Sequence, residues 1–223
     1  NTNRIAASVE SYTLNHSQIV PRIQYEDNRF DFNKIEKITE LFKANNLESY
    51  KYLNIFFNTD KYSDRYLLNL IIEGYYDKIY IMSNDNVSIA DRMDRLNYEL
   101  EQIYETSVKI EQSLSDYFIT MAKMIEIIWN DADSLVGPGR GSAAGFLVNY
   151  LIGITQLDPQ TQMLYLPPWR FIHADRPGLP DIDVDTESTK RLKIFNKIQE
   201  YFQSIGADLI NVCTFGTEGS KSA

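Results

Sequence analysis

Apolar residues recur at helical intervals through the first part of the chain. The series Ile35, Ile38, Leu41 and Phe42 predicts a helix of about three turns that ends near residues 45–46. Its polar positions fall on the opposite face, as in a helix that covers a hydrophobic core.

Two further helices are expected before residue 107. Ser63 is the predicted N-cap of a helix that continues across Gly74 towards Ile79. Ser88 followed by Asp91 is a capping box, which predicts an amphipathic helix to about residue 106. We therefore expect a mainly helical segment, and we interpret its charged residues as solvated faces without catalytic chemistry.

The pattern changes in the second half. Residues 117–129 are densely apolar, which predicts a buried helix, with a strand at its start as the alternative. Residues 135–185 then hold six of the ten glycines and all but one of the seven prolines, which concentrates tight turns in one region. Beyond it, the spacing predicts a helix over residues 187–204 and a strand over 209–213. Functional sites are often built on such turns, so we expect the functional residues in this region.

Composition places the chain among globular proteins. Its 223 residues, 43% of them hydrophobic and 24% charged, suffice for a hydrophobic core that needs no disulfides or structural metal ions. One cysteine allows no internal disulfide or Cys-rich zinc site, and no apolar run reaches the roughly 18 residues of a membrane span. The formal net charge of −9 disfavours a nucleic-acid binder that uses its whole surface. The opening residues contain neither Met nor a secretory leader, so we expect an excerpt of a longer sequence.

The segment VGPGRGSAAG at residues 136–145 is a candidate anion-binding loop. Glycines let the backbone approach a ligand, and the amides at the start of the expected helix over residues 146–152 attract negative charge. Arg140 adds a permanently charged donor for phosphate, and Ser142 is suited to cap the helix or to bind phosphate. No Lys-Ser or Lys-Thr pair follows, which excludes a Walker loop. A dinucleotide-binding loop and a simple packing bend remain as alternatives.

The segment LPDIDVD at residues 179–185 alternates three aspartates with two apolar residues, which predicts a strand with one buried side. The Cα atoms of Asp181 and Asp183 would lie about 6.5–7 Å apart, so their carboxylates could hold a pair of divalent ions. An EF-hand is excluded because Thr186 and Leu192 stand where it needs Gly and Glu. A solvated strand face is the remaining alternative, although Asp is poorly suited to strands.

These two segments belong to a longer series of motifs. Between and after them stand Asp158-Pro159, Arg170-Phe171 and Thr214-Phe215-Gly216-Thr217 with Lys221. Their order and spacing resemble those of the motifs in the alpha subunit of bacterial DNA polymerase III, which belongs to the C-family replicative polymerases. The resemblance implies an α+β fold: a polymerase-beta-like nucleotidyltransferase palm, with a mixed sheet and flanking helices. It divides the chain into a helical segment over 1–106, a palm core over 107–213 and the start of a truncated thumb over 214–223.

The resemblance also implies roles for individual residues. Asp181 and Asp183 match two of the family's three catalytic, magnesium-binding aspartates, whereas Asp185 matches an aspartate expected to hold neighbouring residues. The expected nucleotide-binding residues are Gly139, Arg140, Gly141, Ser142 and Lys221.

The implied function is that of a DNA-directed DNA polymerase in DNA replication, which transfers a nucleotide from a dNTP to a primer 3′ hydroxyl with two Mg²⁺ ions. Implied partners are primer–template DNA, dNTPs and other replisome subunits, in the cytoplasm and without a membrane. Because the third carboxylate and the fingers are missing, we expect no primer extension by this chain alone. The alternatives are a catalytically inert nucleotide-binding or scaffold module with a palm fold, and a Rossmann-type oxidoreductase.

Overall fold

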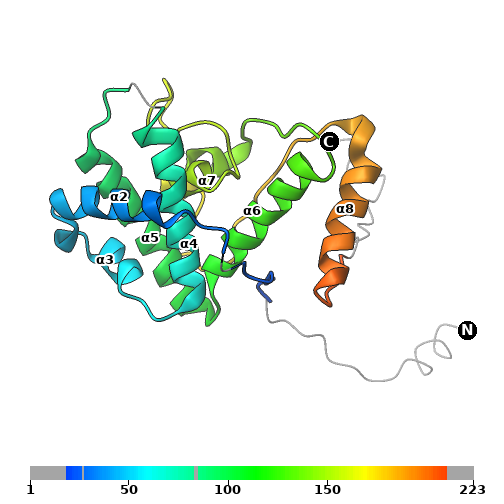
Figure 1. Cartoon of the computed structure of the whole chain (residues 1–223), viewed down its shortest axis with the longest axis horizontal. Coiled ribbons are helices and arrows are strands. Elements are labelled where there is room, and N and C mark those ends of the chain that lie inside the picture. Colours follow the sequence, from blue (N-terminus) through cyan, green and yellow to red (C-terminus); the bar gives the residue numbers. More distant parts are fainter. Residues whose placement is uncertain (1–18, 27, 83–84, 210–223) are drawn as a thin grey trace, which may run out of the picture.

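The computed structural model describes residues 19–26, 28–82 and 85–209, and the regular elements of these residues are helices (Figure 1). The α-helices are α2 (Phe32–Ala44), α3 (Lys51–Phe57), α4 (Tyr62–Tyr75), α5 (Ile89–Ile110), α6 (Leu114–Asn130), α7 (Leu147–Leu151) and α8 (Arg191–Ser204). They are joined by the 3₁₀ helices η1 (Leu47–Ser49), η3 (Gly141–Gly145), η4 (Pro168–Arg170) and η5 (Ser188–Lys190), and by the π-helical turn η2 (Tyr76–Tyr80).

Helix starts follow local signals in the sequence. α5 begins directly after Ser88, whose hydroxyl accepts a hydrogen bond from the amide of Asp91 at 3.1 Å. The predicted N-cap is therefore confirmed, while the Asp91 carboxylate accepts from the Ser88 hydroxyl. α4 begins at Tyr62, so Ser63 is not its N-cap. Ser63 is instead buried, and its hydroxyl lies 2.9 Å from the hydroxyl of Ser113, the N-cap of α6.

The expected α+β palm with a mixed sheet is wrong, because the described residues contain no sheet. Residues 179–185 are extended, but the bridge nearest to them is an isolated antiparallel pair between Val136 and Thr186. A strand becomes part of a sheet through a ladder of hydrogen bonds to a neighbouring strand, and here the extended segment lies against helices. The second expected strand, residues 209–213, lies outside the described residues except for Leu209.

Two hydrophobic clusters hold the helices together. The larger cluster is built from α2 to α5, α7 and the first half of α6. The smaller cluster joins the second half of α6 to α8, which runs beside α6 on the side away from α2 and α3 (Figure 1). The acidic segment crosses from one cluster to the other, since Ile182 packs against the larger and Val184 against the smaller.

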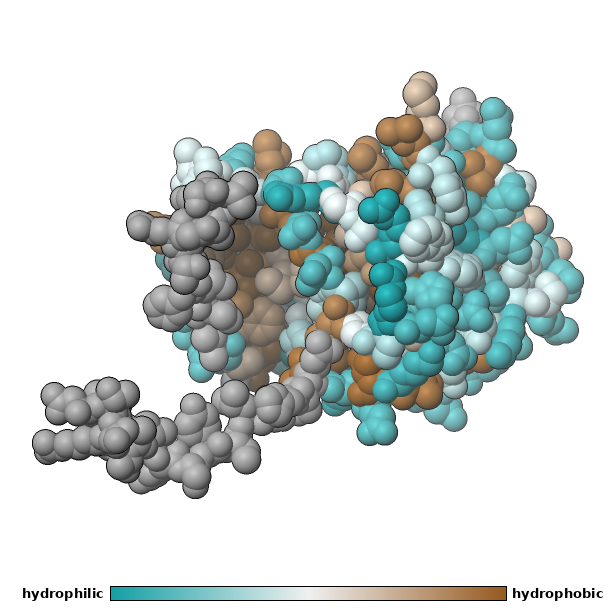
Figure 2. Space-filling model, turned by 180° about the vertical axis from the view of Figure 1, so that it is seen from behind, coloured by the Kyte–Doolittle hydropathy of each residue, from teal (hydrophilic) through white to brown (hydrophobic). Residues whose placement is uncertain are grey.

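Much of the face opposite to the view of Figure 1 is hydrophilic (Figure 2). Seen from behind, apolar residues gather in a hollow on one side of the molecule, while hydrophilic residues cover most of the other (Figure 2). Among the helices of the described residues, none combines the length and the apolar character that a membrane crossing requires.

Candidate functional site

The acidic segment is fixed at its start by α6. The hydroxyl of Tyr117 donates a hydrogen bond to the carbonyl of Pro180, directly before Asp181. Burial, and after it the charge of Asp181, raises the pKa of Tyr117 to about 12, so the phenol stays protonated and can donate at neutral pH. Ile182 and Val184 are partly buried, whereas the three aspartates of the segment are exposed. The predicted alternation therefore holds without a sheet, and the carboxylates face solvent.

The glycine loop lies beside these carboxylates. The amide of Gly137 donates to the carbonyl of Asp185 at 2.8 Å. Gly141 has a φ of 60°, in the left-handed region that favours glycine, and a Cβ atom built there would lie 3.7 Å from Oδ2 of Asp183. The loop and the acidic segment thus border the same small volume.

Arg140 and Asp185 form an ion pair across this junction. Nη1 of Arg140 lies 2.9 Å from Oδ1 of Asp185, and the two side chains are 61% and 60% exposed. The hydrogen bond to Asp185, then the charges of Asp185 and Asp183, raise the pKa of Arg140. Because exposed pairs contribute little to stability, this guanidinium can exchange its partner for a phosphate group. Asp185 holds a neighbouring residue, as expected.

Asp181 and Asp183 are the candidate metal ligands. No group of three or more His, Cys, Asp or Glu side chains is placed to hold a metal ion in the part of the chain that the structure describes. Mg²⁺ in phosphate-transfer sites is commonly bound by one or two carboxylates together with substrate phosphates and water. Two exposed carboxylates on one side of an extended segment, beside a glycine loop, fit the protein's share of such a site.

The amides at the start of the helix after the loop are not free. α7 has five residues and is shorter than predicted. The amides of Leu147 and Val148 donate to the two carboxylate oxygens of Glu99, at 2.8 Å each. The expectation that these amides receive an anionic ligand is therefore wrong, because Glu99 already occupies that position. The amides of Gly139 and Arg140, which have no backbone partner among the described residues, remain available to a phosphate.

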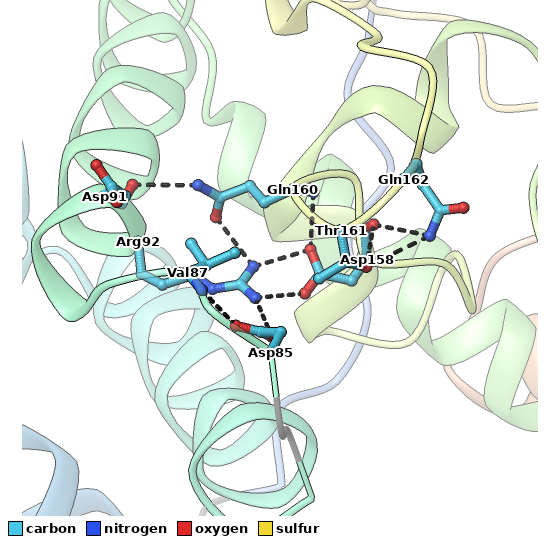
Figure 3. A network of polar contacts seen from close by, with 8 residues as sticks. All are labelled: Asp85, Val87, Asp91, Arg92, Asp158, Gln160, Thr161 and Gln162. Atoms are coloured by element: carbon cyan, nitrogen blue, oxygen red, sulfur yellow. Dashed lines mark hydrogen bonds and ion pairs between the residues drawn. The ribbon is translucent and has the colours of Figure 1, made fainter.

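Some charged residues of α5 are buried, contrary to the prediction of solvated faces. Arg92 and Glu99 are both 0% exposed. The guanidinium of Arg92 binds Asp158 at 2.7 and 2.8 Å, Asp85 at 2.7 Å and Gln160 at 3.0 Å (Figure 3). Arg92 thereby fixes the turn that follows α7. The sequence signal was the spacing of these residues, which places them on the face of α5 that also carries buried leucines.

A hollow of about 280 Å³ borders the acidic segment. Ser142 and Asp181 line it, and so do Arg170, His173 and Arg176. The two arginines bring positive charge to the hollow that Asp181 lines. Arg170 belongs to the series of motifs in the sequence, but no role was predicted for either arginine.

The structure brings most of the selected residues together. Gly139 to Ser142 come from the loop and η3, and Asp181 and Asp183 from the extended segment beside them. Lys221 lies outside the described residues, so its expected contact with nucleotide stays a prediction.

Comparisons with known proteins agree with the resemblance seen in the sequence. The family described as "Bacterial DNA polymerase III alpha NTPase domain" matches residues 65–223. The chain is 42% identical over 227 residues to the "Probable DNA polymerase YorL" of Bacillus subtilis (strain 168) and to the "DNA-directed DNA polymerase" of Bacillus phage SPbeta. These matches cover 100% of the chain and 16% of each relative's length.

A further relative is the "DNA polymerase III subunit alpha" of Staphylococcus aureus (strain MRSA252). It is 40% identical over 124 residues, which are 54% of this chain and 11% of that protein. The motifs and the family match converge on one conclusion: the chain belongs to the bacterial DNA polymerase III alpha NTPase domain family.

Proposed function

We propose that the glycine loop and the acidic segment form the nucleotide-binding part of a DNA-directed DNA polymerase. Asp181 and Asp183 would hold Mg²⁺, and the loop would hold the triphosphate of an incoming dNTP. Primer–template DNA and other replisome subunits are the proposed partners of the longer protein, on the strength of the family alone.

Each group has a distinct task in this proposal. The amides of Gly139 and Arg140 bind phosphate oxygens at close range, and the Arg140 side chain adds a donor with a fixed positive charge. Ser142 offers a hydroxyl from the edge of the hollow that Asp181 also lines. Mg²⁺, when bound, would offset the charges of the carboxylates and the triphosphate and activate the attacking hydroxyl.

One observation carries the proposal: Oδ2 of Asp183 lies 3.7 Å from the Cβ position of Gly141. A triphosphate bound along the loop would therefore lie within reach of an ion held by the acidic segment. Separate sites for anion and metal would not require this proximity, whereas a shared site does.

The test is calorimetric titration of the chain with dATP, with and without Mg²⁺. Binding is expected to require Mg²⁺ and to weaken in Asp181→Asn, Asp183→Asn and Arg140→Ala. Asp60→Asn is the matched control, because it removes one exposed carboxylate from the connection between α3 and α4. Equal affinity in the parent chain and all four variants would refute the site, and so would binding that is indifferent to Mg²⁺.

A further inference from the structure

α5 holds the glycine loop from its buried side through an ion pair. Nε of Arg95 lies 2.6 Å from Oε1 of Glu99, and the side chains are 10% and 0% exposed. Glu99 accepts the first two amides of α7, and Arg95 donates to the carbonyl of Gly145, the last residue of η3. One pair therefore contacts the backbone at three points, one at the last residue of the loop and two at the start of α7.

A side chain of α7 also holds η3. The amide nitrogen of the buried Asn149 side chain donates to the carbonyl of Ala143 at 2.9 Å. The end of η3 also has no spare room, because a Cβ atom on Gly145 would lie 2.8 Å from Cβ of Leu166. The residues of η3 that follow Gly141 in the sequence are thus held by hydrogen bonds and by close packing.

Packing alone does not require a buried ion pair at this place. Burying two charges is costly, and apolar residues of similar volume often stabilise a core as well or better. Burial raises the pKa of Glu99, while Arg95 and the two amides of α7 oppose that shift. What the pair provides beyond volume is a set of bonds aimed at particular backbone groups.

We infer that Arg95 and Glu99 are positioning residues for the glycine loop. They hold the far end of η3 and the start of α7, and through this short, rigid turn they keep Gly141 beside Asp183. Glu99 also fills the anion position at the start of α7, which leaves the amides before Gly141 as the place for phosphate. The inference rests on the proposed function, since it concerns the geometry of the same site.

The test compares Glu99→Gln with the parent chain by two readouts. The first is the set of amide resonances, by NMR, over residues 139–148, where we expect shifts throughout and faster hydrogen exchange at Leu147 and Val148. The second is affinity for dATP with Mg²⁺, which we expect to fall about tenfold, as for the loss of a hydrogen bond to a charged group. Arg95→Lys keeps the positive charge but loses the planar guanidinium with its several donors. It should therefore shift the same resonances and weaken dATP binding less than Glu99→Gln does.

Two controls separate positioning from general stability. Asp94→Asn removes an exposed charge from the neighbouring position of α5, and Ile103→Val loosens the core below the same helix. Neither should shift the loop resonances or weaken binding. The inference is overturned if Glu99→Gln leaves the loop resonances unchanged. It is also overturned if Ile103→Val lowers thermal stability by as much as Glu99→Gln does and weakens dATP binding by as much.

Failure of the proposed function gives a different result. If the parent chain does not bind dATP with Mg²⁺, the proposed function fails, while the resonances still show whether the pair positions the loop. If Glu99→Gln does not fold, Arg95→Lys provides the same two readouts, and unchanged loop resonances there overturn the inference.

Discussion

The guanidinium of Arg140 and the carboxylate of Asp185 lie 2.9 Å apart where the glycine loop meets the acidic segment. The arginine proposed to bind phosphate is thus engaged by the one aspartate of the segment that is not proposed to bind metal. Because both side chains are exposed, a triphosphate bound as proposed would compete with Asp185 for the same donors.

Removing this competitor should strengthen nucleotide binding. In Asp185→Asn the acceptor charge is gone, while the bond from Gly137 to the backbone carbonyl is kept. We expect affinity for dATP with Mg²⁺ to rise a few-fold, measured by calorimetric titration beside the Asp60→Asn control. A loss of affinity as large as that of Asp181→Asn would contradict this role and make Asp185 a metal ligand.

Gly141→Ala should weaken dATP binding more than it lowers stability. The left-handed backbone at this position costs an alanine about 1–2 kcal/mol, and the added methyl group would lie 3.7 Å from Oδ2 of Asp183. We expect a modest loss of folding free energy in urea unfolding and a clear loss of dATP affinity, because the methyl group fills the space between loop and acid. Unchanged affinity would place the phosphates elsewhere.

Gly74→Ala should act on the fold. A Cβ atom at Gly74 would lie 2.0 Å from the carbonyl oxygen of Leu151, so α4 and α7 would have to separate. We expect a loss of about 1–3 kcal/mol in urea unfolding. Gly178→Ala is the control, because nothing lies within 4 Å of its added Cβ. Equal stability of the two variants would argue against the close packing of α4 on α7.

Because of Lys78, the free energy of unfolding should vary with pH in the alkaline range. It donates to the carbonyl of Tyr150 and lies 4.8 Å from that ring, and burial lowers its pKa from 10.5 to about 8. Between these two values the unfolded chain keeps a proton that the folded chain has lost, so stability rises with pH. Above about pH 10, partly buried tyrosines such as Tyr25 and Tyr117 reverse the trend. Their pKa values are raised in the folded chain, so they resist an ionisation that unfolding permits.

The measurement is urea unfolding at intervals between pH 8 and about pH 9.5. The parent chain should gain up to about 2 kcal/mol over this window relative to Lys78→Met, which has no proton to lose there. Parallel pH profiles for the two chains would show that Lys78 titrates alike in both states.

Local signals were sufficient to predict some features of the fold and the exposed side of the acidic segment. The N-cap bond between Ser88 and Asp91 depends on residues three positions apart, and this helix start formed as predicted. The alternation of residues 179–185 likewise places the aspartates on the solvent side, because the two apolar residues between them pack on the helices. Both patterns are properties of a short stretch of chain.

Features that depend on distant partners were missed or mispredicted. The sheet required a neighbouring strand, and among the described residues the extended segment instead packs two apolar side chains against the helical clusters. Glu99 looked like a surface charge because its partners, the amides of Leu147 and Val148, lie 48 and 49 positions away. Arg92 is buried for the same kind of reason, with Asp158 lying 66 positions away.

The central claim is that the acidic segment and the glycine loop serve one metal–nucleotide site, and Mn²⁺ tests it directly. Mn²⁺ bound by Asp181 and Asp183 broadens NMR signals of nearby amides, so those of Gly141 and Ser142 should broaden together with those of the aspartates. Excess Mg²⁺, or the double substitution Asp181→Asn with Asp183→Asn, should restore them. Broadening confined to other parts of the chain, with the loop signals unchanged, would contradict the account.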